Sequence, residues 1–195
     1  SYTQQIFTAA EMGGPSNISS VAFEMANLAQ QRTFKIYMMH TSESAIASWI
    51  PAANAQLVFD DAQTLVQGWN TFEFTTPFAY NGTDNLLLIV VDETGSYVSG
   101  NTWYVHSSTT NCSRYIYNDS NPYSITSNPT SAGTGLSVRN NIIFGGNCDS
   151  TATCFAPNMY VDNIDTTSAE IIWVPGLDES EWELEYVVYG DTNWI

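Results

Sequence analysis

The 195-residue chain carries four Lys or Arg against 20 Asp or Glu, a formal net charge of −16 at pH 7. Nucleic acids and anionic membrane surfaces need clustered cations on the protein, so neither is expected as a partner. The longest continuous apolar run, from Leu86 to Val91, is far shorter than the roughly 18 residues that a membrane-spanning helix needs.

Charged residues make up only 12% of the chain, while 44% of the residues are hydrophobic and 13% are aromatic. The apolar share is ample for a packed core. Ser, Thr and Asn take the place of the missing charges, since charged residues usually form about a quarter of a soluble domain. This composition favours a β-rich extracellular protein over a cytosolic helical one.

Short apolar segments separated by turn signals run through residues 1–146, and their alternation predicts strands. The segment 85–92 is continuously apolar, which predicts a strand covered on both faces. About eight short strands are typical of an all-β jelly-roll or a related two-sheet β-sandwich. The predicted strands cover 18–25, 34–38, 57–59, 69–77, 85–92, 103–105, 115–117 and 139–145.

Helical periodicity is weak along the whole chain. Residues 25–32 and 42–49 predict at most one turn of helix each. The polar segment 118–135 is rich in Asn, Ser, Thr and Gly, which predicts a long surface loop.

The composition changes abruptly after residue 148. Residues 1–148 hold ten acids and four cations, a net charge of −6, whereas 149–195 hold ten acids and no Lys or Arg, a net charge of −10. The change coincides with a Gly- and Cys-containing segment, which predicts a linker at 147–156. We therefore expect one domain over 1–146 and a second β pattern over 157–195. Its strands are expected near 159–161, 169–174 and 182–188.

The three cysteines form an odd set. Cys148 and Cys154 enclose five residues, so a disulfide pinning the linker is feasible in an oxidising compartment. The alternative is three reduced thiols. With the disulfide formed, Cys112 is left over and is expected to be buried.

Four residues in the last 39 positions carry a family resemblance: Pro157 in the first strand, Trp173 in the second, and Trp182 with Tyr186 in the third. With this spacing, the tail resembles the first half of a fibronectin type III domain, as found in secreted proteins of Bacteroidetes bacteria. The resemblance implies a partial immunoglobulin-like sandwich over 157–195. The family's later strands and its tyrosine corner do not follow, so we expect the native protein to continue beyond Ile195.

The front part carries a second resemblance, through YTQQIFTAAEMGG (2–14), IYMMHT (36–41), SWIP (48–51) and the segment 68–97. These motifs resemble a jelly-roll module of large Bacteroidetes surface and secreted proteins, related to the cleaved-adhesin domains of gingipain-type haemagglutinin regions. The resemblance covers nearly all of 1–146. It implies a non-catalytic module, often stabilised by calcium, that serves in adhesion or beside a secreted enzyme. It does not identify a ligand.

No local catalytic motif occurs in the sequence. The two histidines, His40 and His106, stand at the ends of predicted strands, and there is no nucleophile elbow, zinc-protease or nucleotide-binding motif. A triad of distant residues is recognised by geometry and leaves no local pattern. Pairs of acids occur in any acidic chain and identify no glycosidase. We expect that the chain is not an enzyme.

Acidic residues at predicted strand ends suggest a structural calcium site. Asp92 and Glu93 lie where a strand enters a turn, and Asp84 lies at the other end of that strand. Calcium takes six to eight hard oxygen ligands, which carboxylates and loop carbonyls supply. The alternative is acids placed at turns for solubility. Zinc is not expected, since there is no cluster of Cys and His.

Exposed aromatic residues near loop ends suggest a carbohydrate or protein ligand. Tyr97 and Tyr104, with Asn101 between them in the sequence, are the best candidates for a binding surface. Trp103 and Val105 alternate as core residues do, and Trp49 before Ile50-Pro51 is typical of a packing anchor.

Two triplets resemble the Asp-Ser/Thr-x pattern at which Bacteroidetes proteins are O-glycosylated. They are Asp149-Ser150-Thr151 and Asp165-Thr166-Thr167, which makes Ser150 and Thr166 the candidate sites. The alternative is chance, because short polar triplets are common in a chain rich in Ser and Thr.

Taken together, the sequence predicts a secreted or surface-displayed adhesion module that binds a glycan or a protein within a larger multidomain protein. One alternative is a structural subunit of a surface filament or virion appendage, whose unclosed strands a neighbouring subunit completes by β-augmentation. Another is an accessory domain of a secreted peptidase or glycosidase.

Overall fold

The computed structural model describes residues 1–27, 30–95, 102–119, 123–148, 158–162, 168 and 170–174. The chain divides into two compact units, Ser1–Thr151 and Ala152–Ile195. The division falls inside the predicted linker 147–156. Within the described residues, no helix is long and apolar enough to cross a membrane.

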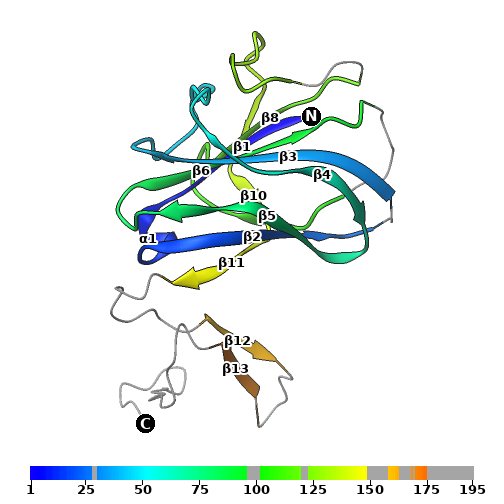
Figure 1. The fold of residues 1–195 in the computed structure, drawn as a ribbon. Helices are drawn as coiled ribbons and strands as arrows, with labels where there is room; N and C mark the ends of the chain where they lie inside the picture. The colour runs from blue at the N-terminus through cyan, green and yellow to red at the C-terminus, as the bar shows by residue number, and fades with distance from the viewer. Residues whose placement is uncertain are drawn as a thin grey trace. The chain divides into compact units, whose positions relative to one another are not determined.

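The first unit consists of antiparallel sheets, and the expected all-β sandwich is confirmed (Figure 1). The larger sheet has six strands, in the order β4 (Gln56–Leu65), β3 (Gln30–Thr41), β6 (Asn85–Asp92), β1 (Tyr2–Phe7), β8 (Ser113–Ile116) and β9 (Thr134–Leu136). The smaller sheet has the order β11 (Ile142–Cys148), β2 (Ser16–Met25) and β5 (Gly68–Tyr80). A short pair joins β10 (Val138–Asn140) to β7 (Val105–Ser107).

The main core lies between the two sheets and is rich in aromatic rings. Phe72 of β5 is at its centre, with the rings of Phe23, Phe34 and Phe59 packed edge-on against it at centroid distances of 5.2 to 5.8 Å. Burying each such side chain contributes about 1.5–3 kcal/mol to folding. The facing residues of β2, β3, β5 and β6 therefore supply the main force that holds the sheets together.

A second apolar cluster covers the opposite face of the six-stranded sheet. Leu86 and Leu88 of β6 point into the main core, whereas Leu87 and Ile89 join the second cluster around Trp49. This confirms that β6 is covered on both faces, and it confirms Trp49 as a packing anchor. Part of the predicted loop 118–135 closes over this cluster, since Trp49 Nε1 donates to the Ser131 carbonyl at 2.7 Å.

The helical turns expected at 25–32 and 42–49 are wrong. The described residues of 25–32 belong mainly to β2 and β3, and 42–49 contain bends only. The described helix is α1 (Ala9–Met12), which begins at a capping box formed by Thr8 and Glu11. A capping box satisfies backbone donors at a helix start, and here it turns the chain between β1 and β2.

Several strand predictions need correction. β1 and β9 were not predicted as strands, although β1 is central in the larger sheet and β9 forms one edge of it. β5 continues beyond Pro77 to Tyr80, because the register with β2 skips residues 74–77, and an irregular edge tolerates the missing proline N–H. The strand predicted at 139–145 is two strands, β10 and β11, which separate at Asn141 and pair with different partners.

In the second unit, β12 (Asn158–Asp162) pairs with β13 (Glu170–Val174) in an antiparallel register. These strands agree with the expected ones near 159–161 and 169–174. The third expected strand, 182–188, lies outside the described residues, and the fibronectin type III assignment stays a prediction.

Candidate binding site

A cavity of about 380 Å³ lies between the two sheets, at the end of the sandwich where β1 begins. Its floor is the inner face of the six-stranded sheet. Thr3 of β1 lies at the centre of this floor, since its register partners are Val90 of β6 and Tyr115 of β8. The volume falls within the roughly 300–1,000 Å³ typical of small-molecule sites.

The sequence of β1 explains why this space is not filled. Because side chains alternate along a strand, Thr3, Gln5 and Phe7 share the inner face. Phe7 packs into the main core, but Thr3 is small and Gln5 is polar, and both line the cavity. The interior is therefore filled at one end of β1 and hollow at the other.

Aromatic side chains form much of the opposite wall. Trp103 forms an isolated bridge with Met25 of β2, which turns its indole inward beside Phe23, at a centroid distance of 6.2 Å and an angle of 77°. Phe23 and Phe72 continue the wall into the main core. The wall thus offers ring surfaces to a ligand that enters from the open end.

A fixed pair of amides lies within the cavity. Gln5, which is 2% exposed, donates from Nε2 to Asn140 Oδ1 at 3.0 Å and accepts from the Asn140 backbone N–H at 3.2 Å. These two bonds hold both side chains in one orientation, so the polar groups of the cavity are preorganised.

An ion pair lies beside the cavity floor. Arg32 of β3 contacts one oxygen of Asp92, at the end of β6, with Nε at 2.7 Å and Nη2 at 2.6 Å. The other Asp92 oxygen accepts from the Thr94 N–H at 3.0 Å. Burial lowers the pKa of the Ser1 α-amino group, which donates to the Asp92 carbonyl. The cavity therefore combines aromatic rings with charged and neutral hydrogen-bonding groups.

The rim carries residues that reach into solvent. Tyr117 is 68% exposed and lines the cavity together with Asn118 and Asp119. Because Tyr117 lies beyond the end of β8 and outside the core clusters, it is the exposed aromatic side chain of the cavity lining and is accessible to a ligand.

The predicted calcium ligands do not gather at one place. Asp84 and Asp92 flank opposite ends of β6, separated by about 26 Å of extended strand, so one ion cannot bind both. Asp92 is paired with Arg32, and Glu93 lies 3.2 Å from Lys35 Nζ, an interaction that raises the pKa of Lys35. Among the described residues, no three potential metal ligands cluster. Calcium binding stays a prediction.

The predicted ligand-binding residues have different outcomes. Tyr104 is 49% exposed, as expected, but does not line the cavity. Tyr97 and Asn101 lie outside the described residues. Trp103 packs against the core, whereas the core position expected for Val105 is wrong: Val105 is 52% exposed because β7 pairs only with the short β10.

The remaining predicted residues give no further site. His40 lies against the rings of Phe78 and Tyr80, and its Nε2 accepts from the Asn81 N–H at 3.1 Å. Cys112 is buried, as expected. Cys154, Ser150, Thr166 and the side chain of Cys148 lie outside the described residues, so the disulfide and the glycosylation sites stay predictions.

Sequence reasoning missed most of the cavity. Its lining includes the residues Thr3, Gln5, Arg32, Tyr115, Tyr117 and Asn140. Two sequence signals concern three of them: the Gln4-Gln5 pair within YTQQIF, and two tyrosines alternating in the predicted strand 115–117. Their meeting depends on strands far apart in the sequence.

Comparison with protein-family models, with curated proteins and with solved structures finds no match in any of the three.

Proposed function

We propose that residues 1–148 form a non-catalytic, extracellular binding module, and that a carbohydrate is the ligand of the cavity between the sheets. The observation that carries this proposal is the lining of the cavity, which places Trp103, Tyr115 and Tyr117 around the amides of Gln5 and Asn140. Sugars present C–H faces that pack on aromatic rings and hydroxyl groups that bond to amides and carboxylates.

The fixed polar groups support a ligand with many hydroxyl groups. Gln5 and Asn140 hold each other in place, and Arg32 and Asp92 do the same nearby. Preorganised partners lose little conformational entropy when a ligand binds. These groups keep further donor and acceptor capacity beyond their mutual bonds, and an apolar ligand would displace water from it without replacing the hydrogen bonds, at a cost of about 1–3 kcal/mol for each unsatisfied group.

Adhesion on a cell surface, a jelly-roll topology and a fibronectin type III tail complete the proposal. They rest on the sequence resemblance and on the composition. In this proposal the module recognises a glycan for a larger multidomain protein, which supplies any further activity.

A glycan array probed with the 195-residue chain tests the proposal, followed by calorimetric titration with the oligosaccharide that binds best. Tyr117→Ala is expected to weaken binding about tenfold, since one stacking contact is worth about 1–1.5 kcal/mol. Tyr104→Ala removes another half-exposed tyrosine, which does not line the cavity, and is expected to leave the affinity unchanged. Absence of binding on the array, or equal effects of both substitutions, contradicts the proposal.

A further inference from the structure

The outer face of the three-stranded sheet presents an exposed indole. Along β5, Asn70 and Phe72 are buried and point inward, whereas Trp69 is 45% exposed and points outward. Its register partner is Glu24 of β2, so the two side chains are neighbours on the same face.

A tyrosine lies on the other side of the same carboxylate. Trp103 is opposite Met25 in an antiparallel bridge, and the Tyr104 N–H donates to the Glu24 carbonyl at 2.9 Å. Since Met25 and Trp103 point inward, Glu24 and Tyr104 point outward. Trp69, Glu24 and Tyr104 therefore form one row across three neighbouring chain segments, which we name the outer row. Trp69 and Glu24, which are register partners on neighbouring strands, have Cβ atoms about 5 Å apart.

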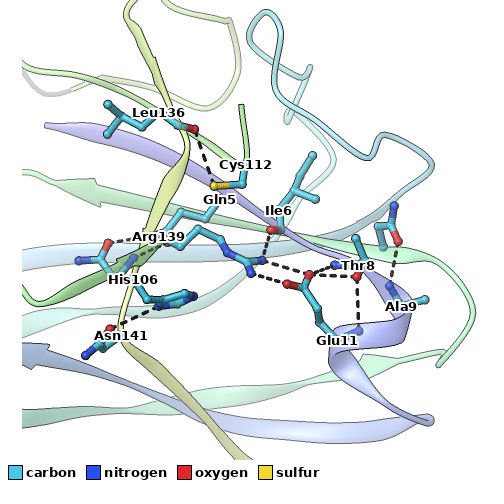
Figure 2. A network of polar contacts seen from close by, with 12 residues as sticks. Gln5, Ile6, Thr8, Ala9, Glu11, His106, Cys112, Leu136, Arg139 and Asn141 are labelled. Atoms are coloured by element: carbon cyan, nitrogen blue, oxygen red, sulfur yellow. Dashed lines mark hydrogen bonds and ion pairs between the residues drawn. The ribbon is translucent and has the colours of Figure 1, made fainter. Parts of the chain in front are cut away.

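The carboxylate at the centre of the outer row is held in position. Asn141 Nδ2 donates to Glu24 Oε2 at 2.8 Å, and Asn141 Oδ1 is hydrogen-bonded to His106 Nδ1 at 3.3 Å. Figure 2 shows the second of these contacts, with the imidazole of His106 beside the amide of Asn141. Asn141 is the residue at which β10 and β11 separate, so the fold supplies the support for Glu24.

The positive charges of the chain are engaged elsewhere. Arg32 pairs with Asp92, Lys35 with Glu93 and Asp60, and Arg139 with Glu11. Arg114 donates to the carbonyls of Ile46, Ala47 and Ala132. These four are the only Lys and Arg of the sequence. The outer face therefore keeps the negative charge of Glu24 and of Glu73, which lies further along β5.

We propose that the outer row binds a Lys- or Arg-bearing segment of a partner protein. A cation between Trp69 and Tyr104 meets the negative faces of two aromatic rings, with Trp the strongest such partner, and the fixed carboxylate of Glu24 supplies the counter-charge. The net charge of −16 attracts a basic partner from a distance. A neutral sugar would also pack on these rings and donate hydrogen bonds to the carboxylate, but it brings no positive charge to compensate Glu24.

The test uses the full 195-residue chain and a synthetic peptide of alternating Lys and Gly, with a peptide of Gln and Gly as the uncharged probe. Binding is followed by tryptophan fluorescence and by calorimetry at low ionic strength. Glu24→Gln and Trp69→Ala are each expected to weaken binding of the lysine peptide about tenfold. The uncharged peptide is expected not to bind.

Two control variants distinguish peptide binding at the outer row from an effect of net charge and from binding at the cavity. Glu43→Gln makes the same charge change at an exposed position away from the outer row and is expected to alter the affinity less than about twofold. Tyr117→Ala, at the cavity rim, is expected to weaken glycan binding and to leave peptide binding unchanged, so the two proposals fail separately. Thermal unfolding of each variant verifies that it is folded.

Three results overturn the inference. The first is unchanged peptide affinity in both Glu24→Gln and Trp69→Ala. The second is an equal loss in Glu24→Gln and Glu43→Gln, which would mean that only net charge matters. The third is that Trp69→Ala and Tyr104→Ala lose binding of a neutral glycan but keep their affinity for the peptide. That result would mean that the outer row binds a sugar.

Discussion

The two ends of β1 each carry an arginine–carboxylate pair, but only one end of the sandwich is closed. At the closed end, Arg139 pairs with Glu11 and donates to the Ile6 carbonyl at 2.6 Å (Figure 2). Its guanidinium carbon also lies 4.4 Å from the centroid of the Phe7 ring. At the open end, Arg32 pairs with Asp92 beside the cavity. The same kind of ion pair therefore helps to close one end of the sandwich and lies beside a cavity at the other.

The difference comes from the side chains that surround each pair. At the closed end, Phe7 packs edge-on against Phe144 at a centroid distance of 5.0 Å, so aromatic side chains fill the interior beside β1. At the open end, the inner face of β1 offers only Thr3 and Gln5. Side-chain volume along one face of a central strand thus decides where the interior is filled.

The largest expected effect on stability is at the closed end. Arg139→Ala removes a buried guanidinium, its contact with Phe7 and its bond to Ile6, and leaves a cavity beside the core. We expect the free energy of unfolding to fall by about 3 kcal/mol, measured by denaturant titration. Lys35→Ala breaks a more exposed ion pair and serves as the control, with an expected loss under about 1 kcal/mol. Equal losses would mean that the closed end is not specially stabilised.

A smaller effect depends on pH. The hydrogen bond from Arg139 lowers the pKa of Glu11 to about 2 from its ordinary value of 4.5. The folded state therefore binds the proton less readily than the unfolded state, so this contribution is complete above about pH 4.5 and is lost as the pH falls towards 2. Because Glu11 is partly exposed, we expect Glu11→Gln to cost about 1 kcal/mol at neutral pH.

Unfolding curves of the wild type and of Glu11→Gln, recorded between neutral pH and pH 2, measure this difference. The two curves are expected to converge as the pH falls through the range between about 4.5 and 2. A difference in unfolding free energy that stays constant down to pH 2 would contradict the assignment.

The smallest effect on stability is expected at the open end and has the opposite sign. Thr3→Ile keeps a β-branched residue in β1 and adds apolar volume to the cavity, so we expect a gain of about 0.5 kcal/mol. The same change is expected to weaken glycan binding in the calorimetric assay. Thr3→Val, which is close to threonine in size, is the control. A loss of stability with unchanged glycan binding would show that the space is not a binding site.

Strands with a regular apolar pattern were the easiest to predict. β3 and β6 were predicted because Phe34, Ile36 and Met38 alternate and because 85–92 is apolar throughout. β4 was predicted from Leu57 and Phe59, but a bulge opposite Ile36 and Tyr37 buries Val58 and leaves Leu57 exposed. A bulge changes which face a residue takes, and its position depends on the partner strand.

β1 escaped prediction because two of its six residues are glutamines. Gln4 is buried, but its amide bonds to Tyr2 and to both backbone groups of Ile50. A buried amide is stable only where partners satisfy it, and two of these three bonds are to Ile50, 46 positions away. The candidate site was hard to predict for the same reason, because strand pairing alone brings Thr3, Tyr115 and Asn140 together.

The sequence by itself determined the all-β class, the buried β6 and the strands around the aromatic core, since alternation and composition are local properties of the chain. It also determined the excess of negative charge, with 20 Asp or Glu against four Lys or Arg. Only the tertiary structure decided that β1 is central, that one end of it is closed by Arg139 and that the other leaves a cavity. Those outcomes depend on which side chains face each other across strands, and that pairing is fixed by the packing of the whole domain.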